Sequence, residues 1–175
     1  WCWGRNGYGQ LGIGNTTAQL TPVRVGTDTW LLVSSQSDHT CAIRSDTTLW
    51  CWGANWSGQV GNGTFTDASS PVQIAGTWSD VAAASSTTCA VRTSGTLHCW
   101  GGNGWMQAGS SPAVDVTTPT QVGSVSTWAR VAVGTYASCA LRSDRSLWCW
   151  GTDAFGSTGQ GTFTWTPNAV PAQVG

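Results

Sequence analysis

Apolar and small residues occur along the chain in short segments separated by turn-forming residues. The segments "TWSDVAAAS" (77–85), "TTCAVR" (87–92) and "TLHCWG" (96–101) are short and contain β-branched and aromatic residues, which predicts three strands. The segment "TPTQVG" (118–123) predicts a fourth strand that begins at a proline, as suits an edge or a strand start. The Gly-rich stretch before this fourth strand predicts an ordered loop.

This four-stranded unit recurs with a period of about 50 residues. "TCAIRSDTTLWCWG" (40–53) returns as "TCAVRTSGTLHCWG" (88–101) and "SCALRSDRSLWCWG" (138–151), and the fragment "WCWG" opens the chain. Repeated four-stranded units of this length are typical of β-propeller blades. We therefore predict an all-β propeller fragment over residues 1–175, made of a half repeat (1–26) and three repeats (27–76, 77–123 and 124–175).

Each repeat places two cysteines ten positions apart around a tight turn. Counting inward from Cys89 and Cys99, Val91 faces Leu97 across a three-residue loop in which Gly95 takes the left-handed position. Directly facing residues of a hairpin lie within reach of a disulfide bond. The spacing favours hairpin disulfides over free thiols or metal binding, since metal sites usually need closely spaced pairs or converging histidines. The predicted disulfide cysteines are Cys41, Cys51, Cys89, Cys99, Cys139 and Cys149.

Composition supports a sheet protein and narrows the function. All basic residues are Arg and all acidic residues are Asp, so the helix formers Lys and Glu are absent. A net charge of −1 with 9% charged residues offers no basic patch for nucleic acid. The longest apolar runs, such as "WLLV", are far too short to cross a bilayer. No catalytic set, phosphate-binding loop or metal-ligand pattern is apparent, so we expect neither an enzyme nor a cofactor.

The ordered motifs of the repeat resemble those of the regulator-of-chromosome-condensation repeat family. These motifs are "WGxNxxGQLGxG" (3–14), a following "PxxVG", then "WxxV", then "HTCA" and, after the turn, "LxxWG". The resemblance implies four-stranded antiparallel blades in a ring that usually closes with seven, of which this chain holds about three and a half. Cys2 lacks its upstream partner, so we expect it to pair outside residues 1–175, with the missing strands supplied by further sequence or by neighbouring copies.

The Gly-rich loop varies among the copies. "GQLGIG" (9–14) and "GQVGNG" (58–63) match the family best, whereas Met106 replaces a glycine in the third copy and "GSTGQG" (156–161) lacks the Gln-Leu pair. The repeated tryptophans are predicted to pack between blades. Aromatic residues that do not repeat in strict phase are candidates for binding, because loops at one end of a scaffold often carry function; they are Tyr8, Trp56, Trp105 and Phe155.

Paired cysteines, the repeat architecture and the lack of a catalytic set favour a non-enzymatic, secreted or cell-surface protein. Disulfide bonds indicate an oxidising, extracellular or cell-surface setting. The partner would be a protein, a glycan or, in a structural polymer, further copies of the chain itself, and neither nucleic acid nor a membrane span is expected. The alternatives are a guanine-nucleotide exchange factor, as the family resemblance implies, and an enzyme.

Overall fold

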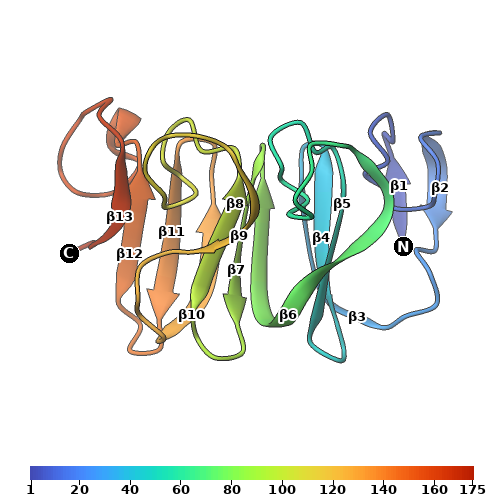
Figure 1. The fold of residues 1–175 in the computed structure, drawn as a ribbon, viewed down its shortest axis with the longest axis horizontal. Coiled ribbons are helices and arrows are strands. Elements are labelled where there is room, and N and C mark those ends of the chain that lie inside the picture. Colours follow the sequence, from blue (N-terminus) through green and yellow to red (C-terminus); the bar gives the residue numbers. More distant parts are fainter.

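The computed structural model describes residues 1–175 as a row of antiparallel sheets (Figure 1). A two-stranded sheet is followed by a seven-stranded and a four-stranded sheet, each with its strands in chain order. The one helix is a short 3₁₀ turn, so none has the length and apolar character needed to cross a membrane. The elements are β1 (Cys2–Gly4), β2 (Gln19–Val23), β3 (Trp30–Gln36), β4 (His39–Arg44), β5 (Thr48–Gly53), β6 (Ala68–Ala84), β7 (Thr87–Arg92), β8 (Leu97–Gly101), β9 (Val116–Gln121), β10 (Trp128–Val133), β11 (Ala137–Arg142), β12 (Leu147–Gly151), η1 (Ala154–Gly156) and β13 (Asn168–Gln173).

The seven-stranded sheet consists of two successive blades that share one long strand. The first part of β6 pairs with β5, from Ala68 opposite Gly53 to Thr77 opposite Thr48, and its second part pairs with β7. The sequence pattern predicted the second part, residues 77–85, as a strand of its own. The chain stays extended between them, so the fourth strand of one blade runs directly into the first strand of the next.

The hairpins have the register expected from the cysteine spacing. Cys89 lies opposite Cys99 and Val91 opposite Leu97, while Gly95 in the turn has a φ of +83°. Disulfide bonds join Cys41 to Cys51, Cys89 to Cys99 and Cys139 to Cys149, each with a Cα–Cα distance of 4.1 Å. Each bond therefore joins the two middle strands of one blade.

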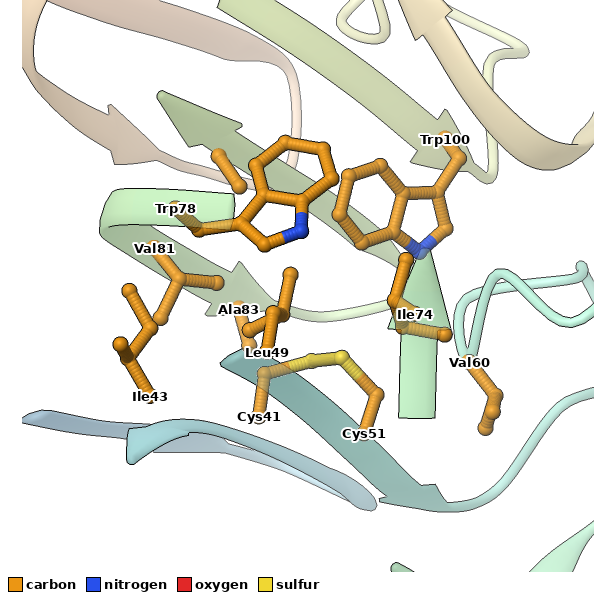
Figure 2. Packing of buried hydrophobic residues seen from close by; sticks show 11 residues of the cluster. Cys41, Ile43, Leu49, Cys51, Val60, Ile74, Trp78, Val81, Ala83 and Trp100 are labelled. Carbon is orange, nitrogen blue, oxygen red and sulfur yellow. A yellow bond between two sulfur atoms is a disulfide. The ribbon is translucent and has the colours of Figure 1, made fainter. Parts of the chain in front are cut away.

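The hydrophobic core lies between blades as well as within them. Trp78 and Trp100, both fully buried, pack at a ring-centroid distance of 5.9 Å over the Cys41–Cys51 disulfide and the aliphatic side chains of two blades (Figure 2). Trp128 and Trp150 repeat the arrangement one blade later. Burial of large aromatic rings makes a major contribution to the stability of such interfaces.

The connections divide between the two ends of the blades. The short β4–β5, β7–β8 and β11–β12 turns lie at the lower end in Figure 1. The long Gly-rich loops of all four repeats, together with the β3–β4, β6–β7 and β10–β11 turns, lie at the upper end. The alternating strand direction thus gathers the candidate binding loops at one end, which we call the loop end.

Candidate functional site

A buried asparagine holds each of the first three Gly-rich loops in shape. The Asn55 side chain accepts a hydrogen bond from the Val60 N–H (2.8 Å) and donates to the Thr64 and Thr66 carbonyls (2.9 and 3.0 Å). Asn6 and Asn103 make the same set of bonds in their loops, and all three side chains are fully buried. One amide group therefore closes each loop by satisfying backbone groups at both of its ends.

A glutamine in each of the first three loops links its loop to the following blade. The side-chain oxygen of Gln59 accepts a hydrogen bond from the Ser57 N–H (2.9 Å). The main-chain carbonyl of Gln59 accepts two more, from the Trp100 indole N–H (3.0 Å) and the Thr88 hydroxyl (2.8 Å). Gln10 and Gln107 occupy the same role with their own neighbours. The indoles of Trp52, Trp100 and Trp150 therefore attach the first three loops to the blades that follow them.

A close steric approach explains why glycine stands two residues after this glutamine. Gly61 has a φ of +85°, and a Cβ atom there would lie 2.5 Å from the Trp100 indole nitrogen. Gly12 makes the same close approach to Trp52. The "GQxG" motif is therefore explained by the joint between one loop and the next blade.

Two groups of aromatic side chains lie on this framework. The first is the pair Tyr8 and Trp56, from successive loops, in edge-to-face contact with ring centroids 5.0 Å apart. Trp56 is 47% exposed, and the Arg5 guanidinium lies 5.3 Å from the Tyr8 ring centroid. Two of the four predicted binding residues thus meet across neighbouring loops.

The second group brings together five aromatic residues from three connections. Trp165 lies between the other predicted residues, with centroid distances of 6.0 Å to Trp105 and 5.5 Å to Phe155. Tyr136 contacts Trp105 at 5.6 Å, and Phe163 contacts Phe155 at 5.8 Å. All five are exposed, from 37% for Trp105 and Tyr136 to 73% for Phe155. We call the two groups together the aromatic loop surface, made of Tyr8, Trp56, Trp105, Tyr136, Phe155, Phe163 and Trp165.

One ion pair and two exposed carboxylates lie at the loop end. Arg5 pairs with Asp38 at 3.2 Å, and the carboxylates of Asp67 and Asp115 accept the backbone N–H groups of Asn55 and Asn103. No group of three or more His, Cys, Asp or Glu residues gathers anywhere in the chain. The loop end therefore offers aromatic faces beside two exposed carboxylates that have no cationic partner.

The fourth loop has an aspartate where the other three have the closing asparagine. Asp153 accepts hydrogen bonds from the Thr158 N–H (2.8 Å), the Thr158 hydroxyl (2.6 Å) and the Thr162 hydroxyl. These bonds to the charged form lower the pKa of Asp153 from its ordinary value. The carboxylate is therefore ionised near neutral pH.

Comparison with known proteins agrees with the repeat pattern. Family models described as the regulator of chromosome condensation (RCC1) repeat match residues 1–43 and 46–91, and a second such model matches residues 128–157. The chain belongs to the RCC1 repeat family. A search of curated proteins finds no match.

Solved structures share the RCC1 propeller fold. Prp20p from Saccharomyces cerevisiae superposes with a TM-score of 0.87 at 22% identity, over 99% of this chain and 45% of its own. Human WBSCR16 gives 0.82 at 22% identity, over 98% and 46%. The ectodomain of the Physcomitrella patens receptor kinase CR4 gives 0.52 at 19% identity, over 87% and 38%. The chain thus spans less than half the length of these proteins and is part of a propeller.

Some features of the RCC1 repeats had no predicted role. The closing asparagines recur in phase and could have been noticed, but their bonding partners lie five to eleven residues away in irregular loops. Tyr136 and its contact with Trp105 join two different blades, which no local pattern indicates.

Cys2 is a half-buried free thiol within residues 1–175, and its burial raises the thiol pKa.

Proposed function

We propose that this RCC1-type chain is a non-enzymatic recognition module that binds a protein partner through the aromatic loop surface. The observation that carries the proposal is the gathering of seven aromatic side chains, six of them exposed, at one end of the blades, where buried asparagines close the first three Gly-rich loops. Tryptophan and tyrosine dominate the binding energy of protein interfaces, and rigid loops lose little entropy on binding. The exposed carboxylates of Asp67 and Asp115 favour a partner patch that is apolar or basic over one that is acidic.

We further propose that the protein works in an oxidising setting, outside the cell or at its surface. The buried hairpin disulfides support this, because such bonds persist in oxidising compartments and are rare in the cytosol. The ectodomain fold relative from Physcomitrella patens supports the same setting. Prp20p, in contrast, binds Gsp1p and histones. From this fold relative we infer for the present chain only that its partner is a protein.

The test is quantitative affinity capture of secreted proteins with the oxidised chain as bait. We expect a specific partner to be captured by the wild type and lost with Trp56→Ala or Trp165→Ala. A residue that contributes 2 kcal/mol to binding weakens affinity about 30-fold when truncated. Both side chains are about half exposed, so their removal should leave the melting temperature within a few degrees.

Leu31→Ala is the matched control. Leu31 is 66% exposed on β3 and lies near the opposite end of its blade, so its truncation should keep the partner bound. Capture that survives both loop substitutions would contradict the proposed surface. Capture that is abolished by periodate oxidation of the secreted material would show a glycan ligand in place of a protein surface.

A further inference from the structure

The loop end already holds one arginine of the chain itself between a ring and a carboxylate. The Arg5 guanidinium lies 5.3 Å from the Tyr8 ring centroid and pairs with the Asp38 carboxylate at 3.2 Å. Arginine suits both contacts at once, because its planar guanidinium stacks on aromatic faces and forms directed hydrogen bonds to carboxylates. This contact shows which kind of group the loop end can accept.

The same combination occurs at the opposite end of the blades, which carries the short turns and which we call the hairpin end (Figure 1). The Arg44 guanidinium lies 3.7 Å from the Trp50 ring centroid and 2.7 Å from the Asp28 carboxylate. The chain thus uses an aromatic face together with a carboxylate twice to hold an arginine, once at each end.

Two further carboxylates of the loop end have no such arginine. Asp67 and Asp115 are exposed, and neither takes part in an ion pair. Each accepts one backbone N–H through a single oxygen, from Asn55 at 2.8 Å and from Asn103 at 3.1 Å, and its second oxygen has no hydrogen-bond partner in the chain. The carboxylates are therefore positioned by the fold and remain able to accept a donor from outside.

The first of these carboxylates lies close to an aromatic residue of the preceding loop. A Cβ atom at Gly9 would lie 2.4 Å from the Ser69 Cα atom, so the two backbones touch. Tyr8 directly precedes this glycine, and Asp67 lies two residues before the serine. The contact between the loops therefore brings the backbone of Asp67 close to that of Tyr8.

The contact recurs one blade later. A Cβ atom at Gly58 would lie 2.8 Å from the Thr117 Cα atom. Trp56 lies two residues before this glycine, and Asp115 lies two residues before the threonine. Each ring of the Tyr8–Trp56 pair thus has an exposed carboxylate on the neighbouring segment, in a place where the chain supplies no arginine to that carboxylate.

Charge is divided unequally between the two ends of the blades. Half of the eight aspartates lie at the loop end, together with a single arginine, Arg5. These aspartates are Asp38, Asp67, Asp115 and Asp153. The arginines on segments toward the hairpin end are Arg24, Arg44, Arg92, Arg142 and Arg145. The loop end therefore attracts a basic partner and repels an acidic one.

We propose that the aromatic loop surface selects a protein partner that presents arginine side chains, and that Asp67 and Asp115 determine this specificity. A guanidinium of the partner stacks on an exposed ring and bonds to the free carboxylate oxygen, as Arg5 does within the chain. Lysine is a poorer match, because its compact ammonium group is strongly hydrated and does not stack. The inference rests on the proposed function and adds the chemistry of the partner.

The test is the binding of labelled synthetic peptides to the oxidised chain, measured by fluorescence anisotropy. One peptide alternates leucine and arginine, and its match carries citrulline, which has nearly the shape of arginine without the charge. The chain should bind the arginine peptide roughly tenfold more tightly, and the difference should shrink as salt is added. Equal affinity for both peptides, or no saturable binding of the arginine peptide, would overturn the proposal.

The double change Asp67→Asn and Asp115→Asn is the decisive variant. Asparagine keeps an oxygen for the backbone N–H, so the melting temperature should be preserved. Affinity for the arginine peptide should fall about tenfold at low ionic strength, while affinity for the citrulline peptide stays unchanged. The matched control, Asp46→Asn with Asp144→Asn, removes the same charge from two exposed turns of the hairpin end and should bind as the wild type does. An equal loss in both double variants would contradict a local role for the two carboxylates.

The outcomes separate this inference from the proposed function. If a captured partner is lost with Trp56→Ala but kept by the Asp67 and Asp115 double variant, the recognition surface stands and the selectivity for arginine is wrong. If no secreted protein is captured but the peptides and variants behave as expected, the proposed function fails and the selectivity for arginine stands.

Discussion

Acidification should destabilise the interface between the second and third blades through His39. This side chain is fully buried, and its Nε2 lies 2.9 Å from the Thr88 hydroxyl of the next blade. The Thr88 hydroxyl donates to the Gln59 carbonyl, so it accepts from Nε2–H and leaves Nδ1 unprotonated and without a partner. A proton added at Nδ1 would place a charge inside the interface that its surroundings offset only in part.

Burial lowers the pKa of His39 from 6.5 to about 4, and a backbone group of Ser85 and the charge of Asp38 oppose this only in part. The unfolded chain therefore binds a proton at higher pH than the folded chain. The contribution of neutral His39 to the free energy of unfolding is complete above pH 6.5 and falls as the pH decreases toward 4. At about 1.4 kcal/mol per pKa unit, the free energy of unfolding drops by about 2 kcal/mol at pH 5 and by about 3 kcal/mol in the limit.

The measurement is denaturant unfolding of the oxidised chain at about pH 7 and pH 5, compared with His39→Thr. Threonine stands at the same position in the next blade, where the Thr87 hydroxyl donates to the Gly102 carbonyl. The variant should be less stable at pH 7, because it loses packing and a hydrogen bond, but its stability should change less with pH. His98, whose pKa is also lowered by burial, remains in both proteins.

The reasoning would be refuted if wild type and His39→Thr lost equal stability between these pH values. Three aspartates with lowered pKa values do not contribute to the stability change between pH 7 and pH 5, because their pKa values lie below the ordinary 3.8. They are Asp46, Asp144 and Asp153. An equal loss would mean that His39 is solvated or protonated in the folded blade pair.

Two further substitutions probe the hairpin and the joint between blades. The double change Cys89→Ala and Cys99→Ala should lower the free energy of unfolding by about 2.7 kcal/mol in the loop-entropy model; unchanged urea unfolding would argue against a stabilising bond. Gly61→Ala should cost about 1–3 kcal/mol more than Gly63→Ala. Both glycines have positive φ values, +85° and +81°, but only the first Cβ would strike Trp100, so equal melting temperatures would contradict the close packing.

The sequence alone determined the features that depend on neighbouring residues. The spacing of Cys89 and Cys99 around a three-residue turn specifies which residues face each other, because side chains alternate along a strand. The 50-residue period indicated propeller blades, and Met106 marked the third loop as a variant. In the structure Met106 takes a φ of +54°, in the left-handed region where Gly9 and Gly58 also lie, so the loop keeps its path.

Tertiary structure decided the features that join one repeat to another. Trp100 and Gln59 are 41 positions apart, and only the stacking of blades shows that the indole bonds to the glutamine carbonyl. The burial of His39 and the contact of Trp105 with Trp165 have the same origin. A local pattern indicates which face of a strand is apolar, but not which neighbour covers it.

The residue that closes the fourth loop shows the same division. The exchange of asparagine for aspartate is visible in the repeated sequence, yet its meaning depends on where the amide of Asn55 points. Only the folded second loop shows that amide among four oxygens, and only the folded fourth loop shows Thr158 and Thr162 donating to the carboxylate instead. A sequence specifies which groups are present, whereas desolvation and the number of available donors are properties of the packed loop.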